Sequence, residues 1–189
     1  MNFTSTKLAG VLIVEMERHQ DERGWFARTW CADEFAAHGL EPTLAQCSSS
    51  FNLKRGTLRG MHCQVAPHEE AKLVRCTRGS FVDVVLDLRV GSSTLHQWIS
   101  VELSADNGKS LYIPKGCAHG FQTLEDNTEV FYSITERFHP DAAHGLRWND
   151  PLFAIEWPLP DAAIVNDRDR SYPLAIPAVM SPIVYLTSP

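Results

Sequence analysis

The sequence has no long hydrophobic run and no excess of positive charge. Its longest nearly apolar stretch, Leu8 to Val14, is interrupted by Gly10, whereas about 20 apolar residues are needed to span a bilayer. The formal net charge of the 189 residues is −6, and a generic grip on DNA or RNA needs a basic surface. We therefore expect neither a membrane span nor a nucleic-acid partner.

The cysteines follow no recognisable pattern. There are five, an odd number, and none forms a Cys-x-x-Cys pair, which argues against a zinc finger or a disulfide scaffold. Residues 1–15 lack the charged region, apolar region and cleavage site of a secretory signal. We expect reduced thiols with structural roles, because free cysteines are often buried, in a cytoplasmic protein.

Helical patterns are scarce as well. Only residues 32–39 favour a short helix, with Asp33 near its start and Gly39 at its end. Elsewhere, short alternating or β-branched segments are separated by turn residues about every 8–12 positions, which is typical of an all-β sandwich or barrel. Helical crossovers, which parallel strands require, are missing. The strands are expected at 73–77, 81–88, 97–103, 110–113 and 129–134.

The composition fits one globular domain, because 44% of the residues are hydrophobic and 21% are charged. From Trp157 onward the chain is rich in proline and weakly periodic. We expect this segment to wrap the barrel or to pack on a neighbour. We assign residues 1–176 to a single domain and expect 177–189 to be a disordered tail.

Three segments concentrate side chains that can do chemistry. They are residues 54–64 with His62, residues 71–75 with Lys72, and residues 113–121 with His119. The last contains the pattern Pro-x-Gly-x-x-His, which in cupin barrels places the histidine on an inward-facing strand after a tight turn. Taken alone, the pattern fits a hydrogen-bonded core histidine equally well.

A metal site is one hypothesis for these segments. His62, Glu69 and His119 are two imidazoles and one carboxylate, a set that suits non-haem iron. A metal-dependent cupin dioxygenase or isomerase would use such a set. The cation of Lys72 argues against it, because it would repel a divalent ion.

Proton transfer without a metal is the other hypothesis. His62 can act as a general base, Lys72 can stabilise an oxyanion, and Tyr132 can donate a proton. Either Asp83 or Asp169 can hold the tautomer of the histidine. Removal of a proton next to a ketone requires this combination of groups.

Several arginines indicate an anion site. Arg23, Arg55, Arg59 and Arg168 lie in an otherwise acidic chain, the first three close to glycine turns. A guanidinium binds phosphate through paired hydrogen bonds, although each of these arginines could equally be a solvated surface group.

Motifs over about residues 20–173 resemble those of the dTDP-4-dehydrorhamnose 3,5-epimerase family. The matching segments are DERGWF (21–26), KRGTLRGMHCQ (54–64), EEAKLVRCTRGSFVDVVLDLR (69–89), IPKGCAHGFQTL (113–124), EVFY (129–132), GLRWNDP (145–151) and VNDRD (165–169). The resemblance implies an all-β jelly-roll (cupin) barrel with a few short helices and a C-terminal wrapping segment. It also implies an enzyme that uses no metal and no other cofactor, and a homodimer that exchanges an N-terminal strand, so that residues near 23–28 reach the partner's site.

The resemblance also assigns roles to residues of this chain. His62 is the base, Asp169 orients it, Lys72 lies by the C4 oxygen, and Tyr132 is the acid on the opposite face. The substrate-binding residues implied are Arg23, Phe26, Arg28, Gln46, Arg59, His119, Phe138 and Arg168. Of these, Arg23 and Arg59 meet the diphosphate, and His119 lies near the sugar.

The implied substrate is a nucleotide-diphosphate sugar, dTDP-4-keto-6-deoxy-D-glucose. Epimerisation at C3 and C5 gives dTDP-4-dehydro-L-rhamnose. The chain departs from the family where Arg28 replaces an acidic residue, Cys63 and Phe138 replace tyrosines, and residues 46–50 lack an asparagine. Arg28 would favour a CDP-linked sugar if it faced the base, because cytosine offers an acceptor where thymine offers a donor; the simpler interpretation is that it adjusts ribose or phosphate contacts.

Three alternatives therefore stay open. The first is a mono-epimerase acting at C3 or C5 of a dTDP- or CDP-linked sugar. The second is the metal-dependent cupin enzyme, and the third is a sugar-nucleotide-binding cupin without turnover.

Overall fold

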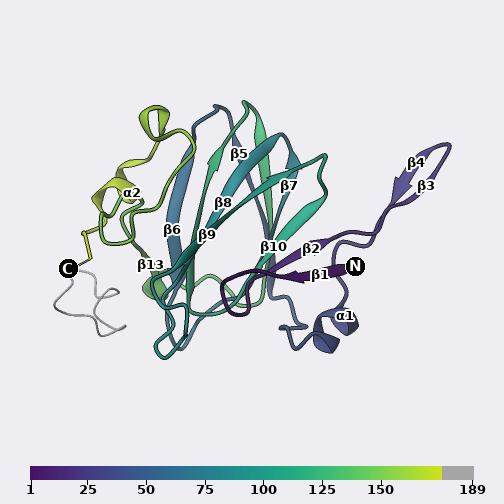
Figure 1. Ribbon diagram of the computed structural model, residues 1–189, viewed down its shortest axis with the longest axis horizontal. Coiled ribbons are helices and arrows are strands. Elements are labelled where there is room, and N and C mark those ends of the chain that lie inside the picture. The colour runs from purple at the N-terminus through teal and green to yellow at the C-terminus, as the bar shows by residue number, and fades with distance from the viewer. Residues whose placement is uncertain (176–189) are drawn as a thin grey trace.

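The computed structural model describes residues 1–175, so the expectation for the 177–189 tail lies outside the described residues. Two antiparallel sheets pack face to face (Figure 1). The six-stranded sheet contains, in spatial order, β1 (Asn2–Ser5), β2 (Leu12–Glu15), β10 (Lys109–Ile113), β7 (Lys72–Arg78), β12 (Thr128–Ile134) and β5 (Gln46–Asn52). The five-stranded sheet contains β13 (Ala143–Gly145), β6 (Leu58–Gln64), β11 (Cys117–Thr123), β8 (Ser80–Asp87) and β9 (Trp98–Ser104). This is the expected all-β jelly roll of the cupin type, and the five predicted strands are confirmed to within about two residues at their ends.

Strand β8 shows how the sequence produces the two layers. Successive side chains of a strand point to opposite faces of its sheet. Phe81 and Val85 pack into the core between the sheets, whereas Val84 and Leu86 pack into a second core on the other face. Because both faces are covered, the strand has an almost continuous apolar sequence instead of a strict alternation.

Asp87 ends β8 as a fully buried carboxylate. Its oxygens accept hydrogen bonds from the guanidinium of Arg89 at 2.8 Å and from the hydroxyls of Ser92 and Thr94 at 2.6 Å. Burial opposes ionisation, but these donors outweigh it and hold the pKa of Asp87 well below its ordinary value. The carboxylate is thus a charged anchor for the turn that follows the strand.

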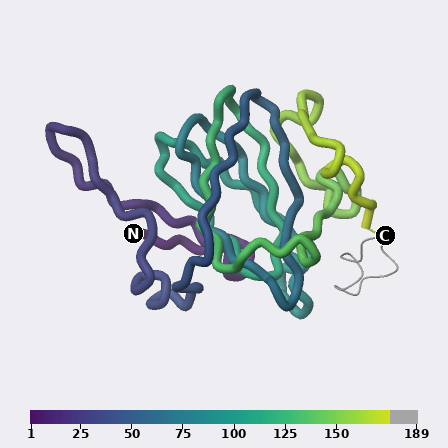
Figure 2. Tube along the Cα trace, turned by 180° about the vertical axis from the view of Figure 1, so that it is seen from behind, coloured from purple at the N-terminus to yellow at the C-terminus, as the bar shows by residue number. Residues whose placement is uncertain are grey.

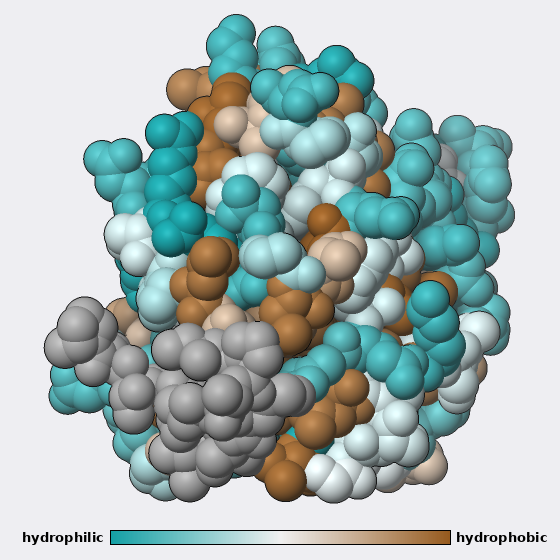
Figure 3. Space-filling view, turned by 60° about the vertical axis from the view of Figure 1, so that its left-hand side comes forward, coloured by the Kyte–Doolittle hydropathy of each residue, from teal (hydrophilic) through white to brown (hydrophobic). Residues whose placement is uncertain are grey.

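The C-terminal part of the described chain packs on the five-stranded sheet of its own barrel, which is one of the two arrangements expected from its proline-rich composition. Trp157 and Val165 are buried in the second core, and Ile164 forms a parallel bridge with Thr57, the residue before β6. Figure 3 brings this side forward and shows hydrophobic side chains interspersed with polar ones. The short 3-10 helices η1 (Pro140–Ala142) and η2 (Pro160–Ala162) lie before and within this segment.

Two α-helices lie outside the two sheets. Helix α1 (Ala32–Ala37) was predicted; it buries Phe35, and Gly39 follows it with a φ of 70°. Helix α2 (Asp167–Ser171) was not predicted, and it is capped by Asn166, whose side chain accepts the backbone N–H of Asp169 at 2.7 Å. Among residues 1–175, no helix is long and apolar enough to cross a membrane.

A small hairpin projects from the body. Strands β3 (His19–Asp21) and β4 (Gly24–Phe26) form it, and both views place it at the opposite end of the molecule from α2 (Figures 1 and 2). Two large aromatic side chains on it face solvent, because Trp25 is 51% exposed and Phe26 is 76% exposed. The hairpin therefore leaves apolar surface uncovered within one chain.

Candidate active site

A cavity of about 370 Å³ opens between the two sheets. The five-stranded sheet contributes His62 from β6 and His119 from β11, which face each other across the strand pair. The six-stranded sheet contributes Lys72 from β7 and Tyr132 from β12. Lys72 pairs with Ile134, two residues beyond Tyr132, so the two side chains share the inward face of that sheet. The cavity thus has two chemically distinct walls.

Gly60 makes the position of His62 possible. Its φ is 138°, and a Cβ atom there would lie 2.5 Å from the Cα of Gly120 on β11. Only glycine allows this approach of β6 and β11. The Gly60 N–H also donates to Oδ2 of Asp169 at 3.0 Å, so the same residue helps to hold the carboxylate beside His62.

His62 and Asp169 form a hydrogen-bonded pair. Nε2 of His62 lies 2.8 Å from Oδ1 of Asp169, whose side chain is 1% exposed. Burial acts to raise the pKa of Asp169, but the contacts from His62 and Gly60 outweigh it and bring the pKa below its ordinary value. Because Nε2 is engaged, Nδ1 of His62 is the nitrogen left to accept a proton.

A second histidine is paired with the other candidate carboxylate. Nδ1 of His119 lies 2.9 Å from Oδ1 of Asp83, and both residues are buried. Burial lowers the pKa of His119 despite the charge of Asp83, so this imidazole is neutral at pH 7. The sequence left Asp83 and Asp169 open as partners of His62, and the structure gives Asp169 to His62 and Asp83 to His119.

The ammonium of Lys72 is held by a carboxylate inside the same cavity. Its Nζ lies 2.7 Å from Oε1 of Glu70, and the two side chains are 11% and 9% exposed. Gln64 donates to the other oxygen of Glu70 at 3.2 Å. An ammonium has three N–H donors, so the ion pair leaves donors free to bind an oxygen in the cavity.

Tyr132 lies on the wall opposite His62. Its ring packs edge-on against His119, with the ring centroids 5.9 Å apart. Burial, with a smaller contribution from Asp83, raises the pKa of Tyr132 against the opposing charge of Arg59. The phenol therefore keeps its proton at neutral pH and is available as a donor.

Three further predicted residues lie at the rim of the cavity. Gln46, Phe138 and Arg168 line it. The backbone N–H of Phe138 donates to the side chain of Gln46 at 3.1 Å, and Arg168 donates to the hydroxyl of Tyr172 at 2.9 Å. Phe138 is exposed and could stack on a planar group.

Arg59 does not line the cavity; it is exposed, and its Nε donates to Asn52 at 2.9 Å.

The structure does not bring the N-terminal candidates to the cavity of their own chain. Arg23 and Phe26 lie on the projecting hairpin, where Arg23 pairs with Asp21. Arg28 donates to Glu34 at 3.0 Å and lines a separate, smaller cavity of about 150 Å³. Any role of these residues toward the large cavity therefore requires a second chain.

The metal set proposed from the sequence does not form. Among residues 1–175, the donor atoms of His62, Glu69 and His119 do not gather within 4.8 Å of one another. A ring nitrogen of each histidine instead faces a carboxylate of the core, and Glu69 does not line the cavity. Glu69 is adjacent to Glu70, and successive side chains of an extended segment point to opposite faces.

Sequence reasoning missed part of the cavity wall. Gln64, Glu70, Cys63 and His144 all line it, and burial raises the pKa of the Cys63 thiol to about 11. Glu70 was accessible to prediction, because residues two apart on an extended segment share a face and Lys72 had already been placed inside. His144 comes from β13, a three-residue strand without a sequence signal.

The sequence of this chain is similar to those of known epimerases. A profile of the dTDP-4-dehydrorhamnose 3,5-epimerase family matches residues 5–175. The chain is 38% identical over 173 residues to a dTDP-4-dehydrorhamnose 3,5-epimerase of Sinorhizobium fredii, covering 92% of this chain and 89% of the relative.

Solved structures that share the fold include two epimerases bound to dTDP-linked sugars. A dTDP-6-deoxy-D-glucose-3,5-epimerase from Legionella pneumophila, in complex with dTDP-4-keto-L-rhamnose, has a TM-score of 0.84 and 34% identity, with 89% of each chain covered. A 3′-monoepimerase from Streptomyces bikiniensis, in complex with dTDP-quinovose, has a TM-score of 0.83 and 29% identity, covering 90% of this chain and 86% of the other.

Proposed function

Because the chain belongs to the dTDP-4-dehydrorhamnose 3,5-epimerase family, we propose that it converts dTDP-4-dehydro-6-deoxy-D-glucose to dTDP-4-dehydro-L-rhamnose. The observation that carries the proposal is the two-walled cavity. A histidine oriented by a buried carboxylate lies on one sheet, and a protonated tyrosine with a lysine lies on the other. Inversion of a carbon beside a ketone needs a base and an acid on opposite faces of the sugar.

The first step is removal of a proton. Nδ1 of His62 takes the proton from C3 or C5, and the C–H electron pair becomes the double bond of an enolate whose charge lies on the C4 oxygen. Asp169 stabilises the imidazolium that forms. The ammonium of Lys72, oriented by Glu70 at 2.7 Å, donates to the C4 oxygen and stabilises its charge.

The second step is protonation from the other face. Tyr132 gives its proton to the same carbon, the C4 ketone forms again, and the configuration at that carbon is inverted. Solvent then removes the proton from His62 and returns one to Tyr132. The same two residues invert the second carbon after the sugar ring has turned between the walls.

The nucleotide part of the substrate extends to the rim. Phe138 offers an exposed ring that can stack on the base, and Gln46 holds the backbone of that residue. Arg168 lines the cavity and carries positive charge that a diphosphate requires, and Arg59, outside the lining, acts on the cavity through its charge, which opposes the rise in the pKa of Tyr132. The two related structures contain dTDP-linked sugars, which favours a dTDP substrate over a CDP substrate for this chain.

The test is an NMR time course in D₂O with dTDP-4-keto-6-deoxyglucose, and with the CDP-linked sugar in a parallel tube. We expect deuterium at both C3 and C5 of the dTDP-linked sugar. Label at only one carbon would favour a mono-epimerase, the activity of the Streptomyces relative. Label only in the CDP-linked sugar would contradict the proposed substrate, and no label in either tube would contradict the proposed reaction.

His62→Ala separates catalysis from binding in the same assay. We expect the variant to lose deuterium exchange while its affinity for dTDP stays nearly unchanged, because the base contacts the sugar and not the nucleotide. An equal loss of exchange and of dTDP binding would make His62 a binding residue.

We also propose a homodimer in which the hairpin of one chain completes the cavity of its partner. The hairpin projects away from its own body (Figures 1 and 2) and exposes Trp25 and Phe26. Arg23 and Phe26 would then contact the diphosphate and nucleotide from the second chain, as the family resemblance implies.

Mixing His62→Ala with Phe26→Ala, each of which the proposal expects to lose net inversion, tests this arrangement. A heterodimer of His62→Ala with Phe26→Ala contains one cavity with an intact base and an intact incoming hairpin, so activity should return after co-refolding. The matched control mixes His62→Ala with Tyr132→Phe, which both alter the cavity of their own chain, and net inversion should not return. Equal behaviour of the two mixtures, or a monomer in light scattering, would contradict the dimer proposal.

A further inference from the structure

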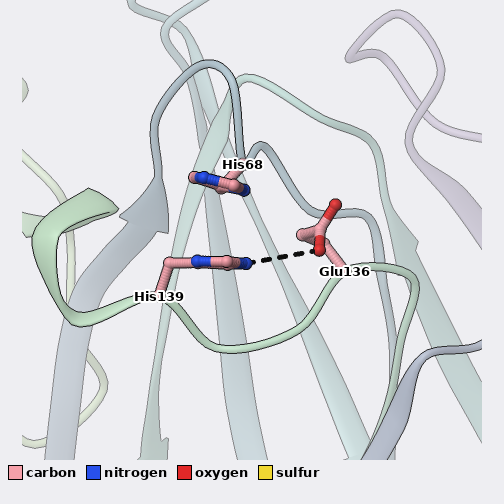
Figure 4. Close-up of side chains that lie close together, drawn as sticks. All are labelled: His68, Glu136 and His139. Atoms are coloured by element: carbon pink, nitrogen blue, oxygen red, sulfur yellow. Dashed lines mark ion pairs between the residues drawn. The ribbon is translucent and has the colours of Figure 1, made fainter.

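Three potential metal ligands gather outside the catalytic cavity. The side chains of His68, Glu136 and His139 place one ligand atom each within 4.8 Å of the others (Figure 4). Nε2 of His139 lies 3.6 Å from a carboxylate oxygen of Glu136, and the rings of His68 and His139 stack with centroids 3.5 Å apart. All three side chains are partly exposed, so an ion can reach them from solvent.

We propose that His68, Glu136 and His139 bind a divalent transition-metal ion of the zinc type. Two imidazoles and a carboxylate are the ligands that Zn²⁺ commonly takes from proteins, with water in the remaining position. Calcium and magnesium are disfavoured, because they prefer sets made of oxygen ligands. The carboxylate of Glu136 supplies the negative charge that attracts a divalent cation, and the charge of Lys115, which also acts on Glu136, opposes it in part.

The backbone that carries these ligands is already fixed. His68 lies in the loop between β6 and β7, and Glu136 and His139 lie in the loop between β12 and η1. The buried side chain of Gln64 joins the two loops, since it donates to the carbonyls of His68 and Arg137 and accepts the N–H of His139 at 2.6 Å. Binding of an ion therefore needs side-chain movement only.

The movement required is small. The two rings are nearly parallel, at 13°, so an ion cannot lie in both ring planes at once. One imidazole must turn until its nitrogen lone pair converges with that of the other. Since both rings are partly exposed, the rotation displaces no core packing.

A bound ion would stabilise the rim of the catalytic cavity. Phe138 lines the cavity and lies between Glu136 and His139 on the same loop. None of the three ligands lines the cavity itself, so the ion would clamp the rim without entering the proton-transfer chemistry. The expected effect is a stiffer loop and a higher melting temperature.

The test is a titration of the EDTA-treated full chain with Zn²⁺ alone, followed by calorimetry and by thermal melts. We expect one ion per chain and a rise in melting temperature. His139→Ala and His68→Ala should each weaken binding at least tenfold, and Glu136→Gln should weaken it less. Glu69→Gln is the matched control, because it removes a neighbouring charge without removing a ligand, and it should bind as the wild type does.

Three results would overturn the proposal. They are no zinc binding by the wild-type chain, the same affinity in His139→Ala as in the wild type, or a loss of binding in Glu69→Gln as large as in Glu136→Gln. Deuterium exchange in His139→Ala is a separate readout, and it should continue because the ligand lies outside the cavity. A failure of zinc binding therefore leaves the proposed epimerase activity untouched.

Discussion

Replacement of Asp169 by asparagine exchanges one carboxylate oxygen for an amide nitrogen at the buried end of the His62 pair. In the wild type, Oδ1 faces Nε2 of His62 at 2.8 Å and Oδ2 accepts the N–H of Gly60 at 3.0 Å. An amide has only one oxygen, so it can satisfy only one of these two donors. Both orientations of the asparagine therefore carry a penalty.

The penalty differs between the two orientations. With its oxygen toward His62, the amide turns its N–H₂ group toward the N–H of Gly60, and the unsatisfied buried donor costs about 1–3 kcal/mol. With its oxygen toward Gly60, the amide donates to Nε2 of His62. The ring proton then moves to Nδ1, the nitrogen that has to accept the substrate proton. The second orientation avoids the buried clash, so we expect it to prevail and to disable the base.

The expected loss follows from this argument. A positioned general base contributes about 10²–10⁴-fold to a rate, and we expect Asp169→Asn to reduce deuterium exchange at C3 and C5 within that range. Affinity for dTDP should change little. Asp167→Asn, on the exposed side of the same short helix, is the matched control and should exchange as the wild type does.

Two results would refute the reasoning. Exchange in Asp169→Asn that stays close to the wild-type rate would show that Asp169 does not set the tautomer of His62. A loss of the same size in Asp167→Asn would trace the effect to unfolding of α2 and not to the pair. Circular dichroism of both variants distinguishes the two explanations.

The remaining predictions concern other groups. Tyr132→Phe should retain deuterium exchange better than net inversion, as NMR of substrate and product would show; an equal fall in both would give the phenol another role. Glu70→Gln leaves the partly buried ammonium of Lys72 without its carboxylate partner and should destabilise the fold in urea unfolding, by less than the about 3–5 kcal/mol of a fully buried pair, whereas Glu69→Gln should not. Because the pKa of Asp87 is depressed in the folded chain, its stabilisation is complete above the unfolded value of about 3.9 and is lost as the pH falls below it; Asp87→Asn should remove this part of the pH dependence of unfolding. A thiol reagent at pH 8 should modify exposed Cys47 at once, and buried Cys76 and Cys117, with pKa values raised to about 11 and about 12, only on unfolding; rapid reaction of both would contradict the packing.

The fold could be predicted where local pattern and burial agree. Strand β8 has a run of β-branched residues because both of its faces are covered. Strand β5 was missed, since its sequence is polar and it lies at the edge of its sheet. Helix α2 was missed because five mostly charged residues show no periodicity; the capping side chain of Asn166 was the only local signal.

The site could be predicted as a set of residues but not as a set of pairs. His62, Lys72 and Tyr132 were identified from the sequence, and the cavity brings them together. The partners of the two histidines could not be assigned, because Asp83 and Asp169 are both acidic residues far from His62 in the chain. Only the packing of α2 against β6 decides that Asp169 reaches it.

The proposed base and acid, His62 and Tyr132, lie on different sheets, so the separation of the two layers fixes the distance between them. Packed sheets lie about 10 Å apart, and within that gap an imidazole and a phenol can reach the two faces of one six-membered ring. The distance between the imidazole of His62 and the phenol of Tyr132 is therefore set by the core between the two sheets. It does not depend on the sugar ring that binds between them. Which carbon of the sugar lies between His62 and Tyr132 depends on how the residues at the rim of the cavity rotate the sugar ring in its own plane. Substitutions at the rim should change the position that is inverted, whereas substitutions in the core should change how fast inversion occurs.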